Sequence, residues 1–202
     1  MNGLDSPEGI AVDAVGNVFV PGLMTDNVFK ITPGGVITQI IDASGDGVNT
    51  LASPKNVAVD SIGNAYVTGF DNAFKISPGG VITQIIDGAG DGVSALVGAD
   101  DIAVDSADNV YLVGISSDNA FRITPGGSIS EIIDSTGDGI SELFSADAIA
   151  VDQLGGVYVG SKGFDNVFRI TAGGTTQLIG SSGDGKNPLL GVNALATFGP
   201  DV

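Results

Sequence analysis

The chain has 202 residues, of which 43% are hydrophobic, enough for one sizeable domain with a substantial core. It has no cysteine and no histidine, which excludes disulfides and removes the commonest general base and metal-binding imidazole. With 24 acidic and 7 basic residues the net charge is −17, so nucleic acid and anionic lipid are disfavoured as partners.

The first residues, MNGLDSPEGIAV, show neither a basic segment nor an apolar core, so no signal peptide is visible. No apolar run approaches membrane-spanning length, and we expect no membrane insertion. The acidic, cysteine-free and lysine-poor composition favours an extracellular setting. A cytoplasmic protein, or a mature or trimmed chain, is the alternative.

Taken in chain order, the sequence repeats four short β-rich phrases. The first unit has GIAVD, NVFV, DNVFKIT and, after a Pro-Gly-Gly turn, VITQIID. The turns between the phrases are rich in Gly, Asn, Asp and Pro, as in a β-meander. The same order recurs in three further units, with the triplet AVD spaced by 47, 45 and 47 residues. We place the repeats at about 9–55, 56–100, 101–147 and 148–185.

Four antiparallel strands in about 46 residues are typical of a β-propeller blade. The predicted fold class is all-β, a small propeller of four blades in a single domain spanning 1–202. The phrases resemble the NHL class of propeller repeats, on Gly9 to Asp13, Gly16 to Val20 and Asn27 to Ile31, and the resemblance recurs in every unit. The resemblance implies the fold but not the function, because propellers serve as enzymes, binding platforms and scaffolds alike.

A surplus segment, 186–202, follows the fourth outer phrase, and ALAT within it matches the start of a fifth inner strand. If four blades close a ring, this segment must lie elsewhere on its subunit or on a neighbour; a chain cut from a longer array is the other option. The outer phrase VITQIID has no lysine, no proline and only a terminal aspartate, although such residues usually protect a sheet edge. We therefore expect a homo-oligomer or helical polymer, with a shielded monomer as the alternative.

The loop after each outer phrase resembles the first half of a calcium loop, with oxygens at alternate positions and a glycine at the sharp turn. The bidentate glutamate of such loops is missing, so binding would be weak, and an Asx turn without metal is the alternative. Calcium is the only cofactor that the sequence suggests. Its candidate ligands are Asp42, Asp46, Asp87, Asp91, Asp134 and Asp138.

A second set of aspartates, one at the end of each inner strand, could form a carboxylate ring near the axis or close their own turns. These are Asp13, Asp60, Asp105 and Asp152. The recurring Asp-Asn pairs before the third phrase, such as Asp26-Asn27, are expected to form turns. The in-register aromatic residues, such as Phe74 and Tyr66, are expected in the core between blades.

Enzyme functions find little support in the sequence. The phrase VFKITPGGVITQI also resembles repeats of streptogramin lyase propellers, but those enzymes depend on histidine. Propeller lactonases use a central cation with Glu, Asn and Asp ligands, and the three glutamates, Glu8, Glu131 and Glu142, are not on predicted inner strands. Catalysis needs groups with different roles, whereas the polar residues look nearly identical from blade to blade.

These observations favour a non-catalytic, extracellular structural protein that self-assembles into a filament or tube through blade edges and the C-terminal segment. We expect no catalytic residues and no bound organic cofactor. A monomeric binding module for a carbohydrate, peptide or protein is the alternative. A metal-dependent lactonase or hydrolase is the third hypothesis.

Overall fold

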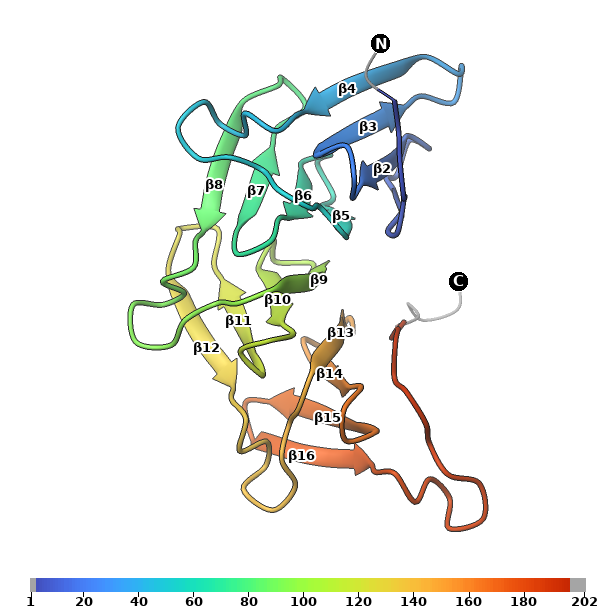
Figure 1. Cartoon of the computed structure of the whole chain (residues 1–202), viewed down its shortest axis with the longest axis vertical. Helices are drawn as coiled ribbons and strands as arrows, with labels where there is room; N and C mark the ends of the chain where they lie inside the picture. The colour runs from blue at the N-terminus through green and yellow to red at the C-terminus, as the bar shows by residue number, and fades with distance from the viewer. Residues whose placement is uncertain (1–2, 197–202) are drawn as a thin grey trace.

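The computed structural model describes residues 3–196, which form sixteen strands and no helix (Figure 1). The first sheet contains β1 (Ala11–Val12), β2 (Val18–Gly22), β3 (Asn27–Ile31) and β4 (Ile37–Ile41). The second contains β5 (Val57–Val59), β6 (Ala65–Thr68), β7 (Ala73–Ile76) and β8 (Ile82–Ile86). The third contains β9 (Ala99–Val104), β10 (Val110–Gly114), β11 (Asn119–Ile123) and β12 (Ile129–Ile133). The fourth contains β13 (Ala146–Val151), β14 (Val157–Ser161), β15 (Asn166–Thr171) and β16 (Gly174–Ile179).

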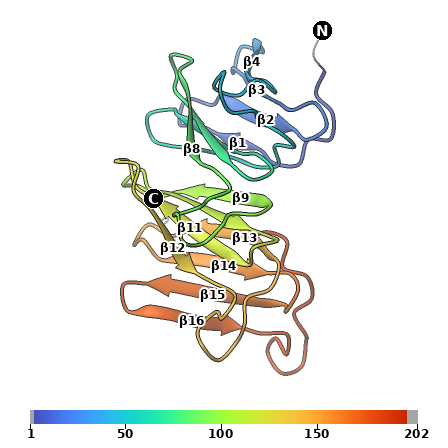
Figure 2. The ribbon, with the colours of Figure 1, turned by 60° about the vertical axis from the view of Figure 1, so that its left-hand side comes forward.

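Each sheet is an antiparallel meander whose strands pair in sequence order, which confirms the predicted all-β propeller of four four-stranded blades. The blades follow one another around an arc, with β5, β9 and β13 on its concave side (Figure 1). The arc is open between the first and fourth blades, and the C-terminal segment lies in that opening. Seen from another side, the sheets are stacked one after another (Figure 2). No helix among residues 3–196 is long and apolar enough to cross a membrane.

Local hydrogen bonds explain why each inner strand turns sharply into the next strand. The Asp13 carboxylate accepts from the backbone N–H of Val15 at 3.1 Å and from that of Asn17 at 2.8 Å. Gly16 between them has φ 86°, a conformation that glycine adopts without strain. The other blades repeat this turn, so these aspartates close their own hairpins.

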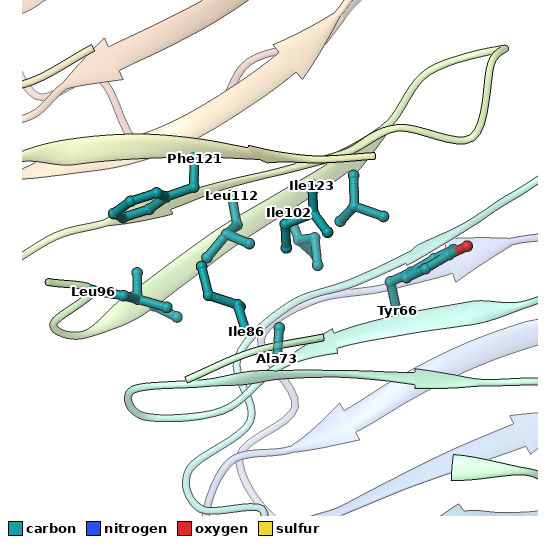
Figure 3. Packing of buried hydrophobic residues seen from close by; sticks show 10 residues of the cluster. Tyr66, Ala73, Ile86, Leu96, Ile102, Leu112, Phe121 and Ile123 are labelled. Atoms are coloured by element: carbon teal, nitrogen blue, oxygen red, sulfur yellow. The ribbon is translucent and has the colours of Figure 1, made fainter. Parts of the chain in front are cut away.

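The hydrophobic core lies between blades rather than inside any one of them. Between the second and third blades, Ile86 of β8 meets Leu96, Leu112 and Phe121 (Figure 3). Leu96 and Phe121 are fully buried, and their counterparts in the other two interfaces are equally buried. A blade therefore gains most of its stability from its neighbours, because a single sheet cannot bury its own faces.

The loop after each outer strand connects a blade to the next one. Asp46 accepts a hydrogen bond from the Gln84 backbone N–H on β8 at 3.4 Å, and Asp138 accepts one from Gln177 on β16 at 3.1 Å. Gly90 in the equivalent loop lies against the Phe121 ring. A Cβ atom at Gly90 would collide with the Ser94 carbonyl, so glycine is required there on steric grounds as well as for its φ of 63°.

The C-terminal segment takes the place where the inner strand of a further blade would begin. The Gly191 N–H donates to Asp165 at 2.5 Å, just as Ser53 donates to Asp26 at 2.7 Å where the chain enters the second blade. Val192 is buried against Gly160 of β14. Because the four blades leave the arc open, the segment packs on its own fourth blade. Thr197 and the residues after it lie outside the described residues.

Candidate functional site

The blades differ at one position on the approach to each inner strand. It holds Glu8, Lys55, Asp100 and Asp147 in the four blades, and Asn193 in the C-terminal segment. The residue before it is Pro or Ala in all four blades, so the repeats can be aligned at this position without ambiguity. The prediction that the polar residues are nearly identical from blade to blade is wrong at this position. Aligning the four approaches one residue at a time would have revealed it.

Three of these residues meet on the concave side of the arc. Lys55, just before β5, forms an ion pair with Asp100 at the start of β9. Asp100 is in turn hydrogen-bonded to Asp147 at the start of β13. Lys162, just after β14, places its Nζ 3.9 Å from Asp147 Oδ2. We refer to Lys55, Asp100, Asp147 and Lys162 as the concave charge cluster.

The carboxyl groups of Asp100 and Asp147 share a confined space. Burial raises the pKa of Asp147, and the negative charge of Asp100 raises it further, while Lys162 and Lys55 oppose the shift. The Asp147 carboxyl therefore takes up a proton more readily than an exposed aspartate does.

Asp101 lies beside this pair and joins the two inner strands. One of its oxygens accepts from the Ile102 N–H and the other from the Ile149 N–H on β13, both at 2.8 Å. Burial raises its pKa to about 6, although these two bonds favour the charged form. Asp101 thus holds β9 and β13 together beneath the pair.

Two exposed aromatic rings lie next to each other at one end of the fourth blade. Phe144 precedes β13 and Phe164 follows β14, and their ring centroids are 5.3 Å apart with the planes tilted by 42°. They border a hollow of about 460 Å³, which is also lined by Glu142 and Asp118. Exposed rings of this kind can stack on the apolar part of a small molecule.

The predicted calcium ligands direct their oxygens at the backbone of their own loops. Asp42 accepts from the N–H and Oγ of Ser44, and Asp46 accepts from the N–H groups of Val48 and Asn49. The bonds from Asn49 and Val48 lower the pKa of Asp46 to about 2. The same backbone bonds are made by Asp87, Asp91, Asp134 and Asp138. This is the geometry of an Asx turn; calcium binding there stays a prediction.

The concave charge cluster does not fit a divalent cation. Among residues 3–196 no group of three or more acidic side chains is arranged to hold a metal ion. The physical reason is that the Lys55 ammonium already occupies one face of Asp100, while both oxygens of Asp101 accept backbone N–H groups. We therefore derive no chemical step through a metal.

Several other acidic residues named in the sequence analysis have structural contacts. Asp60, for example, accepts from Asn64 Nδ2 and from the Tyr66 hydroxyl at 3.0 Å, so its carboxylate folds back on its own hairpin. Glu131 accepts from Ser94 Oγ at 2.7 Å and from Asn119 Nδ2 at 3.0 Å, which ties a loop to β12. Glu142 borders the aromatic hollow.

Comparison with known proteins supports the fold. No family model and no curated protein matches the sequence. Among solved structures, a propeller in a nidogen–laminin complex is 17% identical and covers 96% of this chain and 70% of its own, with a TM-score of 0.74. A catalytically inactive histidine-to-alanine variant of virginiamycin B lyase from Staphylococcus aureus, with quinupristin, is 19% identical and covers 86% of this chain and 55% of its own, with a TM-score of 0.68.

A candidate gluconolactonase is 15% identical and covers 88% of this chain and 64% of its own, with a TM-score of 0.63. This chain covers 55% of that lyase variant and 54% of a streptogramin B lyase, so it spans about half the length of these two proteins. These neighbours are named as lyases and as a candidate gluconolactonase, and they contradict our expectation of a non-catalytic, self-assembling structural protein. The prediction that the chain is not an enzyme is wrong for the same reason.

Proposed function

We propose that this chain belongs to a hydrolytic propeller that opens cyclic esters, with the Asp100–Asp147 pair as its acid and base. The observation that carries the proposal is the hydrogen-bonded carboxyl pair on the concave side, placed between the ammonium groups of Lys55 and Lys162. The similarity to a candidate gluconolactonase supports the choice of a lactone as substrate.

The chemistry follows from the unequal environments of the two carboxyl groups. The ionised member of the pair takes a proton from a water molecule, and the water oxygen attacks the lactone carbonyl. The protonated member gives its proton to the ring oxygen as the C–O bond breaks, so the products are a hydroxy acid and a pair that again holds one proton. The ammonium group of Lys162 stabilises the negative charge that develops on the carbonyl oxygen.

Hydrolysis is favoured over lyase chemistry by the residues available. The virginiamycin B lyase variant that lacks one histidine is inactive, and this chain contains no histidine. A carboxyl pair can activate water without an imidazole. Phe144 and Phe164 border a separate hollow and lie three residues from Asp147 and two residues from Lys162 in the sequence, and we assign them the apolar part of the substrate.

The test is hydrolysis of five- and six-membered lactones, followed by proton release between pH 4 and 8. We expect Asp147→Asn and Asp100→Asn each to lower kcat by about 100-fold or more, since each removes one proton-transfer role. Asp5→Asn, on an exposed residue of the first blade, is the matched control and should leave the rate unchanged. If the unmodified chain releases no protons from any of these lactones, the proposal fails.

Three further assignments are proposed on the sequence. The repeated phrases support an NHL-like class of propeller, as do the four meander blades. The acidic, cysteine-free composition supports an extracellular setting. The alternating oxygens of the Asp42 and Asp87 loops support weak calcium binding, independent of the proposed catalytic pair.

A further inference from the structure

We propose that the two open faces of the arc bind each other in a second copy of this chain, so that two chains close one ring. The fourth blade of each copy would contact the first blade of the other. The inference rests on the packing between blades and does not require the hydrolytic activity proposed above. It also differs from a filament, because the contacts close after two copies.

The first blade exposes side chains that are buried at the same place in every other blade. Leu4 is 43% exposed, whereas its counterpart Leu51 is 1% exposed. Ile10 is 67% exposed, whereas its counterpart Ile102 is 5% exposed. Phe29, which corresponds to the fully buried Phe74, is only half-buried. This face carries the residues that, in the other blades, receive the preceding blade.

The fourth blade exposes the complementary face. Ile179 at the end of β16 is 36% exposed, whereas its counterpart Ile86 is 2% exposed because the third blade covers it. The loop that follows folds like the others, with the N–H groups of Lys186 and Asn187 donating to Asp184. In residues 3–196 no outer strand donates to Asp184 as β8 donates to Asp46. The face is therefore built like the three that do receive a blade.

These two faces are matched because the chain already contains the same interface three times. Ile41, Ile86 and Ile133 each pack on the following blade, and Leu51, Leu96 and Leu143 each pack on the preceding one.

The C-terminal segment holds the place that the second copy would take. Gly191 donates to Asp165 with φ 64°, and Ser6 has the same left-handed conformation, φ 50°, as the residues that make this bond in the other blades. Ser6 of the second copy would replace Gly191 on Asp165, and Pro7 and Ile10 of the second copy would replace Val192 and Leu195, which lie against Gly160. Ring closure is thus in competition with the C-terminal segment, and weakening that segment should favour the dimer.

Ring closure would add a residue to the concave charge cluster. Lys55 contacts Asp100 and Asp100 contacts Asp147, each on the next blade along the arc. Glu8 occupies the same position in the first blade, so Glu8 of the second copy would lie beside Asp147. The dimer would therefore bring a third acidic group to the proposed catalytic pair.

Because the chain has no cysteine, the contact can be tested by placing two. Asp46 bonds to the Gln84 backbone across the first internal interface, and Asp184 of one copy would bond to Gln39 of the other in the same way. We expect the D184C/Q39C double variant to form a covalent dimer under oxidising conditions. The matched control, D46C/Q84C, should form its disulfide within one chain and stay monomeric, which verifies the geometry.

The C-terminal segment is tested in the same background. Val192→Asp, which places a charge against Gly160, should release the segment and raise the yield of covalent dimer several-fold. A ladder of trimers and longer products would overturn ring closure in favour of an open chain of copies. The second copy would be ruled out as the occupant if D184C/Q39C stayed monomeric, with and without Val192→Asp, while the D46C/Q84C control formed its disulfide. Loss of lactone hydrolysis has no bearing on either result.

Discussion

The sharpest test of the packing between blades compares two leucines that hold the same place in their repeats. Leu96 is fully buried between the second and third blades, and Leu4 is 43% exposed on the open face of the first blade. Leu96→Ala removes the side chain from a packed interface and leaves a cavity, which costs about 3 kcal/mol of unfolding free energy. Leu4→Ala removes a side chain that is already in contact with solvent, and should cost less than about 1 kcal/mol.

The assay is urea unfolding followed by the circular dichroism of the strands, first at low micromolar protein. At this concentration we expect the Leu96→Ala midpoint to fall well below that of Leu4→Ala. Equal losses would refute the view that the first face is open. The measurement is then repeated at a hundredfold higher concentration, where a second copy that covers Leu4 would enlarge the cost of Leu4→Ala and leave that of Leu96→Ala unchanged.

Three other outcomes are expected. Gly90→Ala should destabilise the chain by about 2 kcal/mol more than Gly92→Ala in urea unfolding, because both glycines have positive φ but only a Cβ at Gly90 meets other atoms. Burial raises the folded pKa of Asp101 to about 6, so its protonated form favours the folded chain. This contribution to the free energy of unfolding, up to about 3 kcal/mol, should be present below pH 4 and lost as the pH rises through about 6. Asp101→Asn should remove this pH dependence from a plot of unfolding free energy against pH. Calcium at 10 mM should raise the melting temperature of the chain, and D87N/D91N should reduce that rise; calorimetry that shows neither heat nor a shift would refute calcium binding.

The local structure could be predicted from the sequence because each turn is encoded by its own residues. The positive φ of Gly16 and Asp26 follows from glycine and Asp-Asn turns, and the strands between them follow from alternating apolar residues. The aromatic core was also predicted, and Phe74, Phe121 and Phe168 are indeed buried between blades. The residues that specify each turn or strand lie within that turn or strand, or within a few positions of it.

The opening of the arc could not be predicted in this way. It depends on the angle between neighbouring blades, which is set by side chains such as Ile86 and Leu96 packing across the interface. Periodicity gives the number of repeats but not that angle. The sequence therefore suggested a C-terminal segment without a place in the ring, whereas Val192 packs on the fourth blade as the start of a further inner strand would.

The candidate site could not be predicted from the repeat pattern, because that pattern is defined by the residues that the four units share. A repeated fold needs the same residues wherever the backbone turns or the core is packed, so those positions say little about chemistry. Function in such a fold is expected at positions where the backbone is equivalent but the side chains differ. Glu8, Lys55, Asp100 and Asp147 meet this condition, and the structure brings the last three together on the concave side. If the lactone assay shows that Asp100 and Asp147 act together, the same comparison of equivalent backbone positions should locate sites in other nearly symmetric propellers.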